Sequence, residues 1–232
     1  MTEIKALKSY SDDRGNEIIC PTAGEQPVTV NFRGSNNRLA ISPNAKIRHL
    51  NVQFDCDNGS VEIGSHSGVS PLRLFARIGQ DSTVRLGNNV STTDKLTITA
   101  VEGADVTIGD DVMIATDVEI RTDDAHPIFD VTTGQRVNLS QPITIGNHVW
   151  LAKRAIIMGG VSIGNGSVVG FGSIVTKDVP NNAIAAGTPA RVIRKDIAWE
   201  RPHLSGAKPF YKPDADTVTK SQYWNLTAES HE

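Results

Sequence analysis

The chain has 232 residues, of which 38% are hydrophobic and only 5% aromatic, and its formal net charge at pH 7 is −3. This length and composition indicate one globular domain with a short appendage, and the charge excludes a strong electrostatic attraction to nucleic acid. Cys20 and Cys56 are isolated, so neither a disulfide framework nor a zinc motif is indicated. With no long apolar run and no signal peptide, we expect a cytoplasmic protein, and the sequence leaves open a peripheral membrane association.

The first 38 residues show no clear repeat and are predicted to form an irregular cap at one end of the fold. Residues 28–32 (VTVNF) alternate as a short strand does. From Leu39 onward, apolar residues recur in pairs separated by one residue, among them Val61/Ile63 and Val106/Ile108. Their looser spacing predicts coils with small insertions, and the repeat domain is expected to span residues 39–194.

The strictest pattern lies between Ile143 and Val179, where apolar residues recur every six positions. This row contains Ile145, Leu151, Ile157, Ile163, Val169 and Val175. A second row, two positions earlier, is small or β-branched: Ile143, Val149, Ala155, Val161, Ser167 and Ser173. A period of six fits neither a single strand nor a helix, and it predicts a solenoid of short parallel strands. Gly146, Gly164 and Gly170 are expected at its sharp turns, often with positive φ.

The repeat is interrupted once, by the polar segment 121–142, which is predicted to be an extruded surface loop. The loop holds His126, with Asp123, Asp124 and Asp130 nearby. A histidine among carboxylates suits a general base, although an ordinary surface histidine is the alternative. Residues 195–232 form a C-terminal extension, in which Asp196 to Leu204 are expected to form a short helix interrupted at Pro202.

Several motifs together resemble the hexapeptide-repeat acyltransferases, and most of all the O-acetyltransferases of sugars and bacterial surface polysaccharides. The motifs are the hexads, the His-Pro loop, residues 147–150 (NHVW), residues 170–178 (GFGSIVTKD) and residues 186–191 (AGTPAR). The resemblance implies an all-β fold, a left-handed parallel β-helix of triangular section. It also implies a homotrimer with active sites in the grooves between subunits, acetyl-CoA as the donor and no metal.

The resemblance also implies roles for individual residues. His126 corresponds to the catalytic base, and Trp150 corresponds to a tryptophan that lines the donor and acceptor channel; ordinary packing is its alternative. A backbone N–H near Ala152, or a side chain nearby, would bind the oxyanion, and Asp123, Asp124, Asp130 or a main-chain carbonyl would orient the imidazole. Besides Trp150, the coenzyme-binding positions are Ala152, Lys153, Gly170, Phe171, Ser173, Thr176, Lys177, Arg191 and Arg194, where solvated charge is the alternative for Lys177 and Arg194.

The leading hypothesis is an O-acetyltransferase that acts on a sugar hydroxyl of a capsular or lipopolysaccharide glycan or its precursor. The alternatives are N-acetylation of an amino sugar, acetylation of a small molecule such as an antibiotic, and a non-catalytic repeat scaffold. The same β-helix also occurs in zinc-dependent carbonic anhydrases, but His66, His126 and His148 are too irregularly spaced to favour a zinc site.

Overall fold

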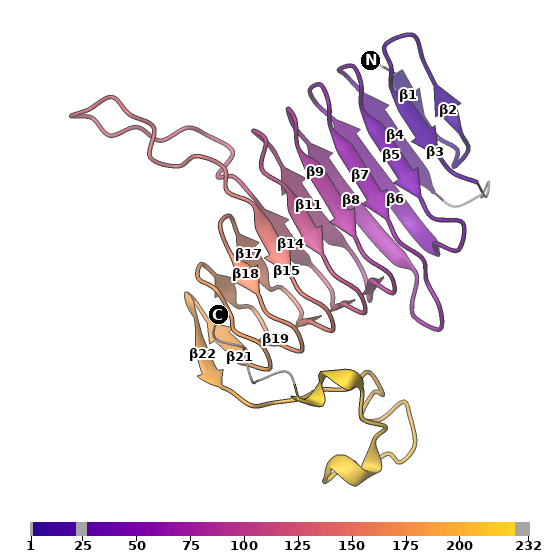
Figure 1. The fold of residues 1–232 in the computed structure, drawn as a ribbon, viewed down its shortest axis with the longest axis vertical. Coiled ribbons are helices and arrows are strands. Elements are labelled where there is room, and N and C mark those ends of the chain that lie inside the picture. Colours follow the sequence, from indigo (N-terminus) through magenta and orange to yellow (C-terminus); the bar gives the residue numbers. More distant parts are fainter. Residues whose placement is uncertain (1, 22–26, 226–232) are drawn as a thin grey trace.

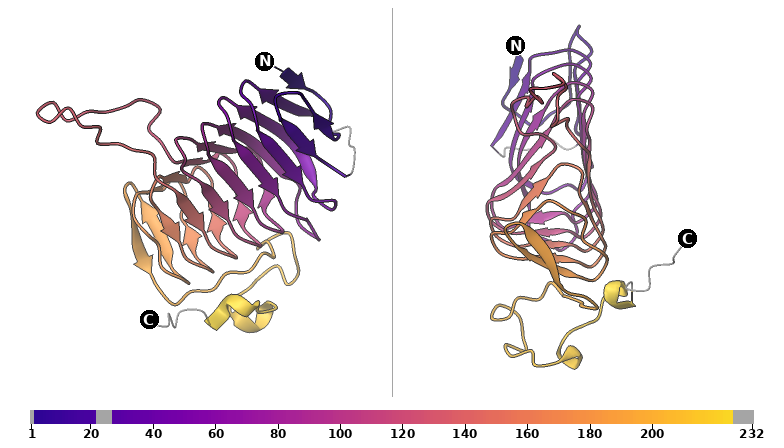
Figure 2. Two further views of the ribbon diagram at one scale, coloured as in Figure 1. Left: turned by 45° about the horizontal axis from the view of Figure 1, so that its top comes forward. Right: turned by 90° about the vertical axis from the view of Figure 1, so that its left-hand side faces the viewer.

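The computed structural model describes residues 2–21 and 27–225, and nearly all of their regular structure is β-strand. The strands stack into a column of three sheets, with one long loop leaving the column and a C-terminal segment lying along the side of several coils (Figure 1; Figure 2). No helix of the described residues is long and apolar enough to cross a membrane. Two short 3-10 helices, η1 (Ala215–Thr217) and η2 (Gln222–Asn225), lie in the C-terminal segment.

The strands form three sheets, I, II and III, and neighbouring strands in each sheet are hydrogen-bonded in the order given. Sheet I contains β1 (Thr2–Ile4), β4 (Val28–Phe32), β6 (Ile47–Phe54), β8 (Leu72–Ile78), β11 (Leu96–Ala100), β14 (Val118–Arg121), β17 (Ile156–Met158) and β20 (Ile174–Val175). Sheet II contains β10 (Ser91–Thr92), β13 (Met113–Ile114), β16 (Trp150–Leu151), β19 (Val168–Val169), β21 (Ile184–Gly187) and β22 (Ala190–Arg194). Sheet III contains β18 (Ser162–Ile163), β15 (Ile143–Ile145), β12 (Val106–Ile108), β9 (Thr83–Leu86), β7 (Ser60–Ile63), β5 (Arg38–Ile41), β3 (Glu17–Ile19) and β2 (Tyr10–Ser11).

From β9 onward each coil of the column visits the three sheets in turn, as β15 in sheet III, β16 in sheet II and β17 in sheet I do, whereas the strands from β3 to β8 alternate between sheets III and I. Successive coils pair in parallel, so that Ile108, Ile145 and Ile163 are stacked in register. The fold class predicted from the sequence, an all-β parallel β-helix with an extruded loop and a C-terminal extension, is therefore confirmed.

The residues of the six-residue repeat fill the interior of the column. Every member of both rows is at most 2% exposed: Ile143, Ile145, Val149, Leu151, Ala155, Ile157, Val161, Ile163, Ser167, Val169, Ser173 and Val175. The two buried serines are paired, since Ser167 Oγ donates to the Pro180 carbonyl at 2.7 Å and Ser173 Oγ accepts from the Gly187 amide at 3.1 Å. Burying an aliphatic side chain of this size stabilises the fold by about 1.5–3 kcal/mol, so the hexads account for much of its cohesion.

Side-chain oxygens of Asn and Asp join successive coils at the edge between sheets III and II. Asn165 Oδ1 accepts from the Asn147 amide at 2.6 Å, and Asn147 Oδ1 accepts from the Asp110 amide at 2.7 Å. A Cβ at Gly146 would lie 2.6 Å from Asn165 Oδ1. The expected positive φ at Gly146, Gly164 and Gly170 is wrong, because the left-handed residues at this edge come later, as at His148 (φ 52°). Close approach of the next coil requires the glycine at position 146.

The N-terminal segment enters the column earlier than the predicted boundary at residue 39. The strand predicted at residues 28–32 is β4, which pairs in parallel with β6, and β3 pairs in parallel with β5. In this segment β1 and β2 pair antiparallel, with β4 and β3 respectively. These two strands cover the open ends of sheets I and III, as a cap must to protect unpaired edge groups.

The C-terminal extension lacks the short helix predicted at Asp196–Leu204. That prediction is wrong, because these residues lie in a segment without regular structure that is bonded to the column. The Ile197 amide donates to the Asn182 carbonyl at 3.0 Å, which ties the segment to the coil it crosses. Tertiary contacts thus override local helix propensity. Residues 226–232 of the predicted tail lie outside the described residues.

Replacing Gly146 by Ala should lower the free energy of unfolding by about 2 kcal/mol, because overpacking of this kind typically costs about 1–3 kcal/mol. The added Cβ would meet Asn165 Oδ1 and, at 3.0 Å, the Asn165 amide nitrogen. Chemical denaturation of the variant and of Thr144→Ala, an exposed change on the same coil, gives the measurement. An equal loss in both variants would refute the role of close approach.

Candidate active site

The segment between β14 and β15 forms a projecting arm, residues 122–142, whose outer part is a hairpin (Figure 1). Phe129 and Arg136 form an antiparallel bridge, and the Val137 amide donates to the Ile128 carbonyl at 2.9 Å. Asp130 closes the tip by accepting from the amides of Thr132 and Thr133, both at 2.8 Å. These bonds lower the pKa of Asp130, because they favour its charged form.

Asn138 joins the two sides of the arm beside His126. Its Oδ1 accepts from the Ile128 amide at 2.7 Å, and its Nδ2 donates to the His126 carbonyl at 2.9 Å and to Asp124 Oδ2 at 3.1 Å. Three bonds from one amide side chain fix the backbone on both sides of the histidine. Asn138 therefore positions His126, although its imidazole remains exposed to solvent.

A charged contact ties the arm back to the column. Glu102, in the turn between β11 and β12, accepts from Arg136 Nη1 at 2.5 Å and from Ser140 Oγ at 2.8 Å. The Arg136 bond, followed by the Ser140 bond, lowers the pKa of Glu102 from 4.5 to about 2. A depressed carboxyl pKa stabilises the folded state above the unfolded pKa and loses that effect as pH falls toward the folded value. The anchor therefore persists through the neutral range.

The three acidic residues near His126 are engaged elsewhere in this chain. Asp123 Oδ2 accepts from the Ala125 amide at 2.8 Å, while Asp124 and Asp130 hold Asn138 and the arm tip. Within the described residues, no hydrogen bond reaches the His126 ring. In a single chain, none of these three carboxylates is hydrogen-bonded to the imidazole.

The structure does not bring His126 and Trp150 together in one chain. The arm leaves the column at the edge between sheets I and III, whereas Trp150 lies on β16 in sheet II, the opposite face. The Trp150 side chain points outward, as predicted, since its neighbour Leu151 is fully buried. Its indole is half-buried beside Trp199, with ring centroids 6.0 Å apart.

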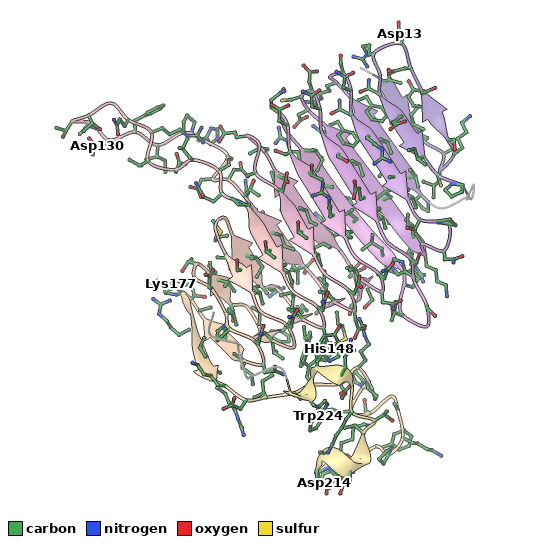
Figure 3. The ribbon with its side chains drawn as sticks, viewed as in Figure 1. Asp13, Asp130, His148, Lys177, Asp214 and Trp224 are labelled. Atoms are coloured by element: carbon green, nitrogen blue, oxygen red, sulfur yellow. The ribbon has the colours of Figure 1, made fainter. Side chains whose placement is uncertain are left out.

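The predicted coenzyme positions fall into two groups. The first group lies at the edge between sheets II and I and contains Ala152, Lys153, Gly170, Phe171 and Ser173. At this edge the Gly172 amide donates to the Lys153 carbonyl at 3.0 Å. Phe171 is 74% exposed there, whereas Ala152 and Ser173 are buried. Arg191 and Arg194 are exposed on β22, the last strand of sheet II, while Thr176 and Lys177 follow β20 toward the next edge (Figure 3).

The C-terminal segment, residues 195–225 and here called the strap, is docked on sheet II through His148 (Figure 3). The imidazole is stacked between the rings of Trp199 and Tyr223, at 4.2 and 4.6 Å. Its Nδ1 lies 2.6 Å from Asp111 Oδ2 and its Nε2 lies 2.9 Å from the Trp199 carbonyl. Arg201 Nε binds the other Asp111 oxygen at 2.5 Å. His148 is therefore a buried structural residue that holds the strap.

His66 is also a buried structural residue. It is 4% exposed, and its Nε2 lies 2.8 Å from the Val90 carbonyl. Burial is the main cause that lowers its pKa. Among the described residues, no group of three His, Cys, Asp or Glu side chains is placed to hold a metal ion.

Comparisons with known proteins identify the family. The model of the Bacterial transferase hexapeptide (six repeats) matches residues 142–177. The galactoside O-acetyltransferase of Lactococcus lactis is 30% identical over 82% of this chain and 88% of its own length. The galactoside O-acetyltransferase of Escherichia coli K12 is 42% identical over 57% of this chain, a match that spans 63% of that relative. The crystal structure of the polySia specific acetyltransferase NeuO superposes with a TM-score of 0.73, at 36% identity over 84% of this chain and 90% of NeuO. The chain belongs to the hexapeptide-repeat O-acetyltransferases.

Three residues that position the arm were not identified from the sequence: Glu102, Arg136 and Asn138. Glu102 and Arg136 are separated by 34 residues, and nothing in their neighbours signals a contact. Asn138 is one of many polar residues in the loop. Only its place opposite His126 in the hairpin distinguishes it, and a hairpin inside a polar segment without alternation has no clear sequence signal.

Replacing Asn138 by Ala should loosen the arm around His126 without affecting the column. The loss of one hydrogen bond, about 1 kcal/mol, corresponds to roughly a fivefold faster exchange of the Ile128 amide. Hydrogen exchange resolved by mass spectrometry or NMR measures this change, with Gln135→Ala as a control on the same arm. Unchanged exchange at Ile128 would show that Asn138 does not hold the hairpin.

Proposed function

We propose that this chain is an acetyl-CoA-dependent O-acetyltransferase that modifies a sugar hydroxyl of a bacterial surface polysaccharide or its precursor. Family membership and the galactoside and polysialic-acid specificity named for its relatives support an O-acetyl transfer to a carbohydrate. We further propose that it acts in the cytoplasm, where its donor is available, and as a homotrimer.

The observation that carries the proposal is the separation of His126 from Trp150. With the arm at one edge of the column and Trp150 on the opposite sheet, a complete site needs the arm of one copy beside sheet II of another. The arm also exposes many apolar side chains, as a segment does that another protein surface covers. Its exposed apolar residues are Ile128 (52%), Phe129 (55%), Val131 (100%), Val137 (62%) and Leu139 (62%). Such a concentration marks an interaction site, which supports assembly through the arm.

In the proposed reaction, His126 takes the proton of the acceptor hydroxyl as that oxygen attacks the thioester carbonyl of acetyl-CoA. The tetrahedral intermediate then expels the thiolate of CoA, which receives the proton from the imidazolium. The oxyanion needs a donor, and the Ala152 amide is already used, since it donates to the Val169 carbonyl at 2.9 Å. We therefore assign the oxyanion contact to the adjacent Lys153, at the same edge.

The coenzyme is proposed to run along the edge between sheets II and I. Phe171 offers an exposed aromatic face for the pantetheine arm or the adenine, and Gly170 lies beside it against Ala186, where a Cβ would lie 2.8 Å from the Ala186 side chain. Arg191 and Arg194 on β22 provide exposed guanidinium groups for the coenzyme phosphates, a geometry that arginine suits well. Thr176 and Lys177 extend this polar surface around the next edge.

Replacing His126 by Ala should lower kcat by at least about 100-fold, because a positioned base contributes about 10²–10⁴-fold. Assembly state and coenzyme affinity should be preserved, as measured by light scattering and calorimetry beside steady-state kinetics. His203→Ala, an exposed histidine in the strap, is the matched control and should retain activity. An equal loss of coenzyme binding in His126→Ala would contradict the assignment as a base.

Acetyl-CoA should raise the thermal stability of the purified protein. A ligand at 100 times its dissociation constant adds about 2.7 kcal/mol to the free energy of unfolding. Differential scanning calorimetry should show a smaller shift in Arg194→Ala and an unchanged shift in Arg48→Ala, an exposed arginine on β6. No shift at millimolar acetyl-CoA would eliminate the transferase and favour a non-catalytic repeat protein.

A further inference from the structure

A cleft of about 560 Å³ opens on sheet I at the foot of the arm. Its floor is formed by outward residues of β8, β11 and β14, among them Thr97 and Thr99, and its wall contains Ala125 and Pro127. Those two residues flank His126 in the chain. The cleft therefore lies next to the backbone of the proposed base.

The arginines of the cleft are neutralised by carboxylates of the same chain. Arg77 is paired with Asp55, which also binds Arg33 at 3.1 Å from outside the cleft. On the opposite side, Arg136 is held by Glu102. Each guanidinium thus has its charge partner within the protein before any acceptor arrives.

Arg121 and Asp123 form the third pair, and it is incompletely bonded. Arg121 Nη1 donates to Glu119 Oε1 at 3.2 Å, and its Nη2 lies 3.6 Å from Asp123 Oδ1, which is too long for a hydrogen bond. The Asp123 side chain is only 10% exposed. Among the described residues, Arg121 Nε and Asp123 Oδ1 are buried without a hydrogen-bond partner. An unpaired donor and an unpaired acceptor thus belong to two side chains that line one cleft.

A hydroxyl group has the chemistry that this pair lacks. It accepts one hydrogen bond and donates another, so a single sugar hydroxyl can accept from Arg121 Nε and donate to Asp123 Oδ1. A carboxylate cannot donate, and it would meet the negative charges of Asp123 and Glu119. The described residues that line the cleft include three arginines and four carboxylates, so no excess positive charge is present to attract an anionic glycan.

Resting on the proposed function, we propose that the acceptor is an uncharged sugar, bound at the foot of the arm through a hydroxyl held between Arg121 and Asp123. This specificity separates the chain from the polySia specific relative, whose acceptor carries a carboxylate on every residue. Glu119 contributes by holding Arg121 and by repelling anionic sugars.

The test compares two acceptors of the same linkage, α-1,4-galactotriose and α-1,4-trigalacturonic acid, in which a carboxylate replaces the C6 hydroxymethyl group of each residue, with oligosialic acid as a third. Binding to the full chain in the presence of CoA is followed by ligand-observed NMR, and kcat/KM is followed by release of the CoA thiol. We expect the uncharged trisaccharide to be preferred by at least about tenfold in both measurements, the scale on which a charged cleft alters encounter with a charged ligand.

Two isosteric variants test whether Glu119 and Asp123 cause the preference for the uncharged trisaccharide. Glu119→Gln and Asp123→Asn should each reduce the discrimination against trigalacturonic acid about tenfold or more. Glu62→Gln removes an equal charge from sheet III, where Glu62 pairs with Arg38 and Arg85, and should leave the discrimination unchanged. The acetyl-CoA stability shift, retained in every variant, confirms that each is folded.

Equal or tighter binding of either anionic oligosaccharide would overturn the proposal. So would the absence of binding by all three acceptors, because the cleft would then not accept a sugar. Both results are binding measurements in the presence of CoA and require no acetyl transfer. A chain that shows the acetyl-CoA shift but rejects the uncharged sugar contradicts only the acceptor assignment, whereas a chain without that shift contradicts the proposed function itself.

Discussion

The stacking of one coil on the next determines most of this structure. Each coil must present its inward aliphatic residue directly below that of its neighbour, as Ile145 does below Ile108, and must also offer a side-chain oxygen to the amide of the previous coil. The two requirements operate in the same register, because strands of one sheet lie about 4.8 Å apart. An insertion is therefore tolerated only at an edge. The arm obeys this limit, since Val106 and Ile143 remain paired across it.

A column that is filled by its own side chains cannot hold a ligand inside. Any site of such a molecule must lie on its outer faces and edges, and a flat sheet face by itself encloses little. The concave surface is the cleft at the foot of the arm. Glu102 and Arg136 hold the hairpin against the column, and Asn138 fixes the backbone of His126. The distance between that arm and Trp150 in one chain then follows from topology, and it makes a second copy a natural partner in the proposed chemistry.

The strap shows how tertiary contacts can decide the conformation of a segment with weak local preference. The buried His148 and the partly buried Asp111 and Arg201 form a polar cluster beside Trp199 and Tyr223, and each member has charged or carbonyl partners. Both ring nitrogens of His148 face acceptors, so the imidazole donates to both only when it carries two protons. The strap covers one side of Trp150 through Trp199, which gives residues far apart in the sequence a shared role in shaping that face.

The sequence alone was sufficient for the solenoid, because a period of six in Ile145, Leu151 and Ile157 has one simple physical interpretation, and for the extruded loop, because Arg121 to Pro142 breaks that period. It also singled out His126 and the outward position of Trp150. It failed at Asp196–Leu204, where docking replaced the expected helix, and it gave the wrong reason for Gly146, where a neighbouring oxygen rather than backbone conformation requires glycine. Glu102, Arg136 and Asn138, and the cleft with Arg121 and Asp123, were decided only by the tertiary structure. The six-residue period of buried side chains can be recognised in a short stretch of sequence. Contacts between residues separated by a coil or an arm depend instead on how the coils are stacked.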